Sequence, residues 1–161
     1  MTEQQAASQD VVMTRIGQAI MLLHGGDREE ARNRFGELWA QIGEDGDALH
    51  RCTLAHYMAD TQDDPVDELA WDLRALTAAE GLSDERVSEH RDALAVRAFY
   101  PSLHLNLAAD YMKLRRPSRA RIHLDRARDA SAVLADDGVD DGYGGGVRAA
   151  IGRLERRLRE L

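Results

Sequence analysis

Three side chains that could act chemically follow one another at four-residue intervals: Cys52, His56 and Asp60. In a helix this spacing places them on one face, where a thiolate, an imidazole and a carboxylate could bind zinc. A structural zinc site takes four ligands, however, and the chain has no second cysteine, while His50 points away from that face. We therefore expect no metal site and a buried, apolar role for Cys52.

His56 and Asp60 could alternatively be an acid–base pair, which would make the protein an enzyme. No nucleophile or phosphate-binding loop accompanies them. The acidic, glycine-rich residues 136–146 lack the Gly-Lys-Ser/Thr ending of a P-loop and the closing Glu of a calcium loop. We therefore expect a linker there, no bound cofactor and no catalytic activity.

The composition predicts an all-α protein. Apolar residues make up 43% and charged residues 31% of the 161 residues, which is typical of a folded domain. Aromatic residues are only 5%, and Ala, Leu, Arg and Glu dominate, which favours helix over sheet. The length suits a single core. We expect a disordered tail over residues 1–8 and one helical domain over residues 9–161.

Cysteine usage and hydropathy bear on the cellular compartment. A single cysteine excludes an internal disulfide, and the first ten residues have neither the basic start nor the apolar run of a secretion signal. No stretch approaches the roughly 18 to 20 apolar residues that spanning a bilayer requires. We therefore expect a cytoplasmic protein with no membrane partner.

Apolar residues at helical spacing predict about seven helices. The first helix runs through Val11 to Leu23 and ends at a pair of glycines. Asp27 and Glu30 then have the spacing of a capping box, which predicts the start of a second helix. The first two helices are therefore expected to form an antiparallel pair joined by a tight turn.

A second pair is predicted from about residue 49 to residue 80. Pro65 lies where the first turn of its second helix is expected, since proline is favoured there. The apolar stripe of that helix is expected to be Leu69, Leu73 and Leu76.

Residues 80–100 interrupt the pattern. Ser83 is expected to cap a weaker helix, which should end where Pro101 restricts the residue before it. We therefore expect an inserted helix or a linker between the second and third pairs.

A repeat emerges when the small residues of paired helices are compared. The separation is 12 residues in two pairs and 14 in the middle pair: Ala19 to Ala31, Ala108 to Ala120, and Ala55 to Leu69. Small residues let two helices approach closely, while larger ones fill the space to the next pair.

The chain resembles the tetratricopeptide repeat family, most clearly in the run LNLAADYMKLRRPSRARIHLDRA of residues 105–127. Six residues fall on the pattern of that family: Leu107, Ala108, Tyr111, Ala120, Leu124 and Ala127. The run QAIMLLHGGDREEARNRF is a further copy. The resemblance covers about residues 11–135 and implies a right-handed α–α superhelix of three helix pairs, closed by a C-terminal capping helix.

The resemblance also implies a function. First helices of such repeats line a concave groove that takes a peptide or a protein segment, so we expect a protein–protein interaction module or scaffold. The side chains expected to contact the partner are Asn106, His56, Thr53, Asp60, Lys113 and His24. Asn106 is similar to the asparagine with which repeats of the kinesin light chain type hold a peptide backbone, and an amide has both donors and an acceptor for that purpose.

Charge is distributed unevenly along the chain, whose net charge is −8. Residues 1–100 hold 9 basic and 20 acidic side chains, and residues 101–161 hold 12 and 9. The basic residues near residue 116 have no interleaved aromatics, so we expect an acidic protein partner rather than nucleic acid. The alternative is an accessory or regulatory subunit acting mainly by self-association as a homodimer, favoured by this asymmetry and by Trp71.

Overall fold

The chain is all-helical throughout the part that the structure describes. The computed structural model describes residues 3–84, 90–136 and 142–161, and their regular structure contains no strand. The described residues form seven helices: α1 (Glu3–His24), α2 (Arg28–Ile42), α3 (Ala48–Asp60), α4 (Pro65–Asp84), α5 (His90–Lys113), α6 (Pro117–Asp136) and α7 (Gly142–Arg159). The all-α prediction is therefore confirmed.

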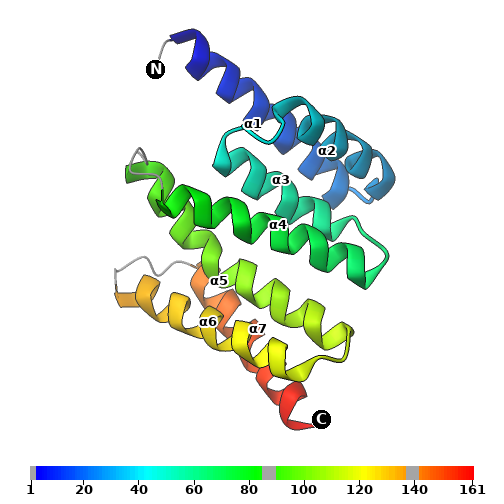
Figure 1. Cartoon of the computed structure of the whole chain (residues 1–161), viewed down its shortest axis with the longest axis vertical. Helices are drawn as coiled ribbons and strands as arrows, with labels where there is room; N and C mark the ends of the chain where they lie inside the picture. The colour runs from blue at the N-terminus through cyan, green and yellow to red at the C-terminus, as the bar shows by residue number, and fades with distance from the viewer. Residues whose placement is uncertain (1–2, 85–89, 137–141) are drawn as a thin grey trace.

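The helices pack one after another in the order of the chain, with the two termini at opposite ends (Figure 1). Each helix contacts the next, and α1 also contacts α3, α3 contacts α5, and α5 contacts α7. Between the described residues of α2, α4 and α6 there is no such contact. The molecule therefore has an odd-helix face, where α1, α3, α5 and α7 lie side by side, and an even-helix face formed by α2, α4 and α6.

The first and third helix pairs turn in the same way. In each turn an N–H donates to the carbonyl oxygen five residues earlier: Asp27 to Leu22 at 2.9 Å and Arg116 to Tyr111 at 2.8 Å. The residue before each donor is left-handed, with φ of 93° at Gly26 and 58° at Arg115. This is the Schellman motif. Gly26 follows Ala19 by seven residues and Arg115 follows Ala108 by seven, so the two pairs share one register.

The small residues that set the predicted register lie at the centres of the helix contacts. None of the five exposes measurable surface: Ala19, Ala31, Ala55, Ala108 and Ala120. Buried apolar side chains gather in three clusters, which join α1 to α2 and α3, α3 to α4 and α5, and α5 to α6 and α7. These five small residues are therefore buried as their predicted role requires, whereas Leu69, the predicted partner of Ala55, is only partly buried and packs on the cluster of α5, α6 and α7.

The junction between the second and third pairs differs from the expectation. Pro101 lies inside α5 and does not end a helix, and Ser83 belongs to the last turn of α4 instead of capping a new helix. A proline inside a helix costs about 3 kcal/mol. Pro101 is fully buried, and its neighbour Leu103 packs in the cluster of α3, α4 and α5, so this burial offsets the cost. The residues of the expected insertion lengthen α4 and α5, apart from residues 85–89, which lie outside the described residues.

Two helix starts also differ from the expectation. Helix α1 begins at Glu3, so residues 3–8 of the expected tail are helical, as their content of Glu, Gln and Ala explains; residues 1–2 lie outside the described residues. Helix α7 begins at Gly142, within the stretch expected to be a linker, of which residues 137–141 lie outside the described part.

Helix caps are only partly where the sequence suggested. Helix α2 begins directly after Asp27, but the Asp27 side chain makes no capping hydrogen bond, and Glu30 instead pairs with Arg34 at 3.1 Å. Asp47 caps α3 by accepting from backbone N–H groups at 2.9 and 3.1 Å, and Asp64 caps α4 at 2.8 Å. The capping box at Asp27 was therefore a wrong prediction, although the helix boundary was right.

Candidate functional site

Five of the six predicted contact residues come together at the junction of α1, α3 and α5. The carboxyl of Asp60 interacts electrostatically with His24, His56 and Lys113, and Asn106 contacts His56. They gather with three acidic residues that the sequence did not single out. We call this set the polar cluster: His24, His56, Asp60, Glu68, Asp72, Asn106, Asp110 and Lys113.

The contact between His56 and Asn106 connects α3 to α5. Asn106 Nδ2 donates to His56 Nδ1 across 3.3 Å, and both side chains are half-buried. Burial lowers the pKa of His56, although the Asp60 carboxylate opposes this effect, so the imidazole is neutral and its Nδ1 can accept. The ring of Phe99 lies edge-on to the imidazole at 5.9 Å. These contacts fix the orientation of both side chains.

Lys113 lies at the outer edge of the cluster. Its Nζ donates to Glu68 Oε1 at 2.7 Å, which connects the end of α5 to the beginning of α4. This hydrogen bond is the main reason that the pKa of Lys113 is raised. His24 and Asp60 are exposed, and partial desolvation by the surrounding helices raises the pKa of Asp60. The exposed part of the cluster therefore presents an ammonium, an imidazole and carboxylates to solvent.

Thr53 does not lie on the exposed part of the odd-helix face, where we expected it. Its side chain is buried, and Oγ1 donates to the carbonyl oxygen of Leu49 at 2.8 Å. A threonine in a helix often satisfies its hydroxyl in this way, by bonding the carbonyl four residues earlier. Its hydroxyl is therefore satisfied within α3.

Asp72 on α4 and Asp110 on α5 form the buried end of the polar cluster. Each is only 2% exposed, and their carboxyl groups share a hydrogen bond. Two ionised carboxylates cannot donate to each other, and Asp72 Oδ1 and Asp110 Oδ2 have no other donor. Burial, followed by the contact with Asp110, raises the pKa of Asp72 to about 11, while burial raises that of Asp110 to about 6. Asp72 is therefore protonated at neutral pH and donates to the Asp110 carboxylate.

The register of α4 explains why the sequence reasoning missed Asp72. Leu73, expected on the apolar stripe, is 38% exposed, whereas Asp72 and Ala75 are buried. Of the predicted stripe, Leu76 is buried and Leu69 packs on the cluster of α5, α6 and α7, so only Leu73 was wrongly placed. Asp72 lies seven residues after the first residue of α4, as Phe35 does in α2 and Leu124 does in α6. The sequence feature that could have identified Asp72 is a polar residue at a repeat position that is apolar in the other two pairs.

Cys52 takes no part in a site with His56 and Asp60. Its side chain is fully buried in the apolar cluster of α3, α4 and α5, and burial raises the pKa of its thiol to about 12. The expectation of a buried, apolar cysteine is confirmed. Within residues whose placement is described, no group of three His, Cys, Asp and Glu side chains has the arrangement of a metal site.

A second pair of titratable residues joins α5 to α6. His104 Nδ1 lies 3.1 Å from His123 Nδ1, and the two rings stack between those of Tyr100 and Tyr111. Burial lowers the pKa of both imidazoles, that of His104 to about 4, so one neutral ring can donate to the other. The stack lies inside the third helix pair. The sequence analysis did not identify it because His104 and His123 are 19 residues apart and belong to different helices. It holds the two helices together.

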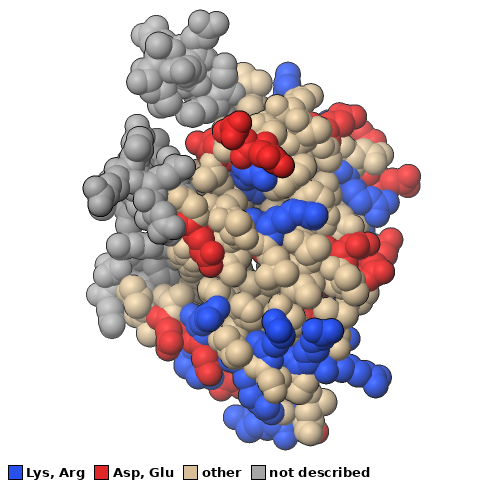
Figure 2. Space-filling model, in the orientation of Figure 1, with Lys and Arg blue, Asp and Glu red and all other residues tan. Residues whose placement is uncertain are grey.

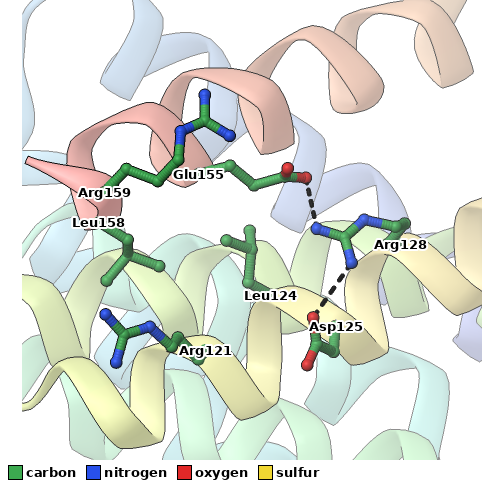
Figure 3. Close-up of a pocket in the computed structure, with 7 residues that line it drawn as sticks. All are labelled: Arg121, Leu124, Asp125, Arg128, Glu155, Leu158 and Arg159. Atoms are coloured by element: carbon green, nitrogen blue, oxygen red, sulfur yellow. Dashed lines mark hydrogen bonds and ion pairs between the residues drawn. The ribbon is translucent and has the colours of Figure 1, made fainter.

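A shallow pocket of about 230 Å³ lies between α6 and α7 (Figure 3). Arg128 crosses one side of it and bonds both Asp125 at 3.1 Å and Glu155 at 2.5 Å, so its charge is compensated. Leu124 and Leu158 form its apolar part. The volume is below the roughly 300 to 1,000 Å³ of small-molecule sites. The pocket therefore lies where α7 packs on α6, and we assign it no ligand.

Comparison with known proteins adds no family to these observations. No family model, curated protein or solved structure matches the chain. None of the helices is long and apolar enough, over the residues described, to cross a bilayer. A function for the polar cluster must therefore be argued from its geometry.

Proposed function

We propose that the protein is a non-enzymatic interaction module that binds a peptide or a segment of a protein partner on its odd-helix face. In this proposal the helix pairs form a tetratricopeptide-like, right-handed superhelix whose concave side is the odd-helix face. Two features support it. Among the described residues, odd-numbered helices contact one another while even-numbered ones do not, and the first and third pairs share their turn conformation and the register of their buried alanines.

The single observation that carries the proposal is the hydrogen bond between Asn106 and His56. It holds two polar side chains, half-buried and from different helices, in fixed positions on one face. After this bond, Asn106 keeps its carbonyl oxygen and a second N–H, and His56 keeps its other ring nitrogen. A peptide backbone presents the complementary N–H and C=O groups at regular intervals. Fixed orientation reduces the entropy lost on binding.

The charges around this pair define the partner further. The cluster has three carboxylates, on Asp60, Glu68 and Asp110, but one ammonium, on Lys113. The segment lying over His56 is therefore neutral or basic. Toward the C-terminal end of the array, the described side chains of residues 112–133 and 146–161 include twelve basic residues, Lys113 among them, and four acidic ones, and this end attracts an acidic surface. The acidic partner expected from the sequence is thus proposed for the α6–α7 end only.

Selection from a displayed peptide library tests the proposal without a known partner. Peptides enriched on the wild-type protein are measured by calorimetry against Asn106→Ala and His56→Ala. We expect each variant to lose about tenfold in affinity, or about 1.4 kcal/mol. Asn33→Ala is the matched control, because Asn33 is an exposed asparagine of α2 on the even-helix face. It should leave the affinity unchanged.

Two results would count against the proposal. One is a library from which no peptide is enriched over a helical control protein. The other is a set of enriched peptides whose affinity falls as much with Asn33→Ala as with Asn106→Ala. Thermal unfolding of each variant shows whether a loss of affinity reflects a loss of folded protein.

A further inference from the structure

An acidic pair lies one helical turn beyond the contact between His56 and Asn106. Asp60 follows His56 by four residues in α3. Asp110 follows Asn106 by four residues in α5, which runs in the same direction as α3 (Figure 1). Since four residues make about one turn, each aspartate lies on the same side of its helix as the polar residue before it. The hydrogen-bonded pair is therefore followed by two carboxyls, an exposed one on α3 and a buried one on α5.

Asp60 presents an exposed carboxylate. In the described part of the chain no basic side chain forms an ion pair with it. The Lys113 ammonium, whose charge acts on Asp60, donates to Glu68 at 2.7 Å. The charge of Glu68 acts on Asp60 as well, with the opposite sign. The ammonium of Lys113 is therefore bound within the molecule, and Asp60 remains available to a basic group from outside.

Asp110 adds a second negative charge close to the first. Its side chain is 2% exposed, and among the described residues its Oδ2 has no hydrogen-bond partner. A buried carboxylate is screened less by salt than an exposed one. Asp60 and Asp110 both act electrostatically on Asp72, so their charges surround the same part of the polar cluster. A cation that approaches Asp60 is attracted by both carboxylates.

The arginines of the chain gather elsewhere. Over the residues that the structure describes, the charges that act most strongly on Asp60, Asp72 and Asp110 come from histidines, carboxylates and Lys113, with no arginine among them. Eleven of the 20 arginines lie in residues 112–133 and 146–161. Figure 2 shows basic side chains gathered over the end of the molecule that α6 and α7 form. The negative charge around Asp60 is therefore left for a ligand to compensate.

We propose that the partner segment carries a lysine or an arginine whose cationic group binds Asp60, one turn beyond the contact between His56 and Asn106. This inference rests on the proposed function, because it takes the segment to lie over that contact. A basic side chain is favoured over a metal ion, since within residues 3–84, 90–136 and 142–161 no group of three ligating side chains has the arrangement of a metal site. A hydrogen bond from an ionised donor to a carboxylate is also about twice as strong as a neutral one.

The spacing of the two contacts fits an extended segment. Four residues of α3 rise about 6 Å. Side chains two residues apart, on one side of an extended chain, are separated by about 6.6 Å. A segment that runs along α3 from His56 to Asp60 thus places its basic residue two positions away from the residue held at His56.

Sequencing of the peptides enriched on the wild-type protein tests for the basic residue. We expect lysine or arginine at one position of the enriched peptides. Calorimetry then measures a double-mutant cycle: replacement of that residue by glutamine, Asp60→Asn, and both changes together. Each single change should lower the affinity about fivefold, which is the upper range for an exposed ion pair. The double change should lower it no further, because both changes remove the same interaction.

Reversal of both charges is a stricter test. Asp60→Lys should reject the basic peptide and recover affinity for a peptide with glutamate at the same position. Glu37→Lys is the matched control, because Glu37 is an exposed carboxylate of α2 on the even-helix face. It should leave the affinity for the basic peptide unchanged. Thermal unfolding shows whether each variant is folded.

Two outcomes would contradict this inference and leave the proposed function intact. One is a set of enriched peptides that require Asn106 but have no basic position in common. The other is a cycle in which the effects of Asp60→Asn and of the peptide change add, since the two groups would then not be in contact. A library from which no peptide is enriched would overturn the inference together with the proposed function.

Discussion

Asp72 and Asp110 share a hydrogen bond between α4 and α5, although each side chain is only 2% exposed. The two carboxyls lie where the second helix pair meets the third, and Asp72 occupies a position that is apolar in α2 and α6. A buried carboxyl pair is stable only with a retained proton. The pair therefore makes the stability of this junction depend on pH.

Substitution of Asp72 by asparagine should weaken that dependence. The folded pKa values of Asp72 and Asp110, raised to about 11 and about 6, exceed the value near 3.9 of an unfolded aspartate. The folded protein thus holds protons that the unfolded chain releases, and stability falls as pH rises from about 4 upward. In Asp72→Asn the amide donates to Asp110 without a titrating proton.

Urea unfolding at several pH values measures the effect. We expect the wild type to lose up to about 1.4 kcal/mol more per pH unit than Asp72→Asn, since this is the linkage for one retained proton. Asp67→Asn removes an exposed carboxyl from the same helix and should behave like the wild type. Parallel pH profiles for the wild type and Asp72→Asn would show that no proton is held at Asp72.

Arg115→Gly should stabilise the protein. Arg115 has a φ of 58°, in the left-handed region that costs a non-glycine residue roughly 1 to 2 kcal/mol. The equivalent position in the first turn is Gly26, with a φ of 93°. Relief of this strain, less the extra freedom of glycine in the unfolded chain, should raise the stability by about 0.5 to 1 kcal/mol. Thermal unfolding would show it as an increase of a few degrees.

The reverse change provides the control for that experiment. Gly26→Ala should destabilise the first turn, because alanine is strained in the left-handed region. If Arg115→Gly lowered the melting temperature, the two turns would not have equivalent conformations.

Cys52 should be unreactive in the folded protein. Its side chain is fully buried and burial raises the pKa of the thiol to about 12, so the reactive thiolate is scarce and inaccessible at neutral pH. Labelling with a thiol reagent should proceed only at the rate of unfolding and become fast in denaturant. Rapid labelling of the folded protein at neutral pH would contradict the packing of α3 against α4 and α5.

The sequence was sufficient for the helices and for part of the site. The helix pairs could be predicted from the glycines and prolines and from the 12-residue spacing of Ala19 and Ala31. This is because local turn conformation and close helix contact depend on residue type. His56 and Asn106 were expected on the binding face because of the resemblance to tetratricopeptide repeats. Their contact with each other was not, since it depends on how two helices 50 residues apart pack.

Two features of α4 and α5 were predicted wrongly from the sequence, because tertiary packing outweighed a local preference. The leucine spacing in α4 placed Leu73 in the buried stripe, and only the surrounding helices show that Asp72 faces inward instead. Pro101 suggested a helix end, yet the burial of this residue and its neighbours in α5 overrides the preference. Both errors concern α4 and α5, where the repeat is least regular.

Nuclear magnetic resonance titration tests directly whether the odd-helix face binds the partner. A peptide selected on the wild-type protein is added to the labelled protein, and backbone amide shifts are followed. We expect the largest changes on α3 and α5 around His56, Asn106 and Lys113, and we expect them to vanish in Asn106→Ala. Changes concentrated on the outer surfaces of α2, α4 and α6, with none around Asn106, would contradict it.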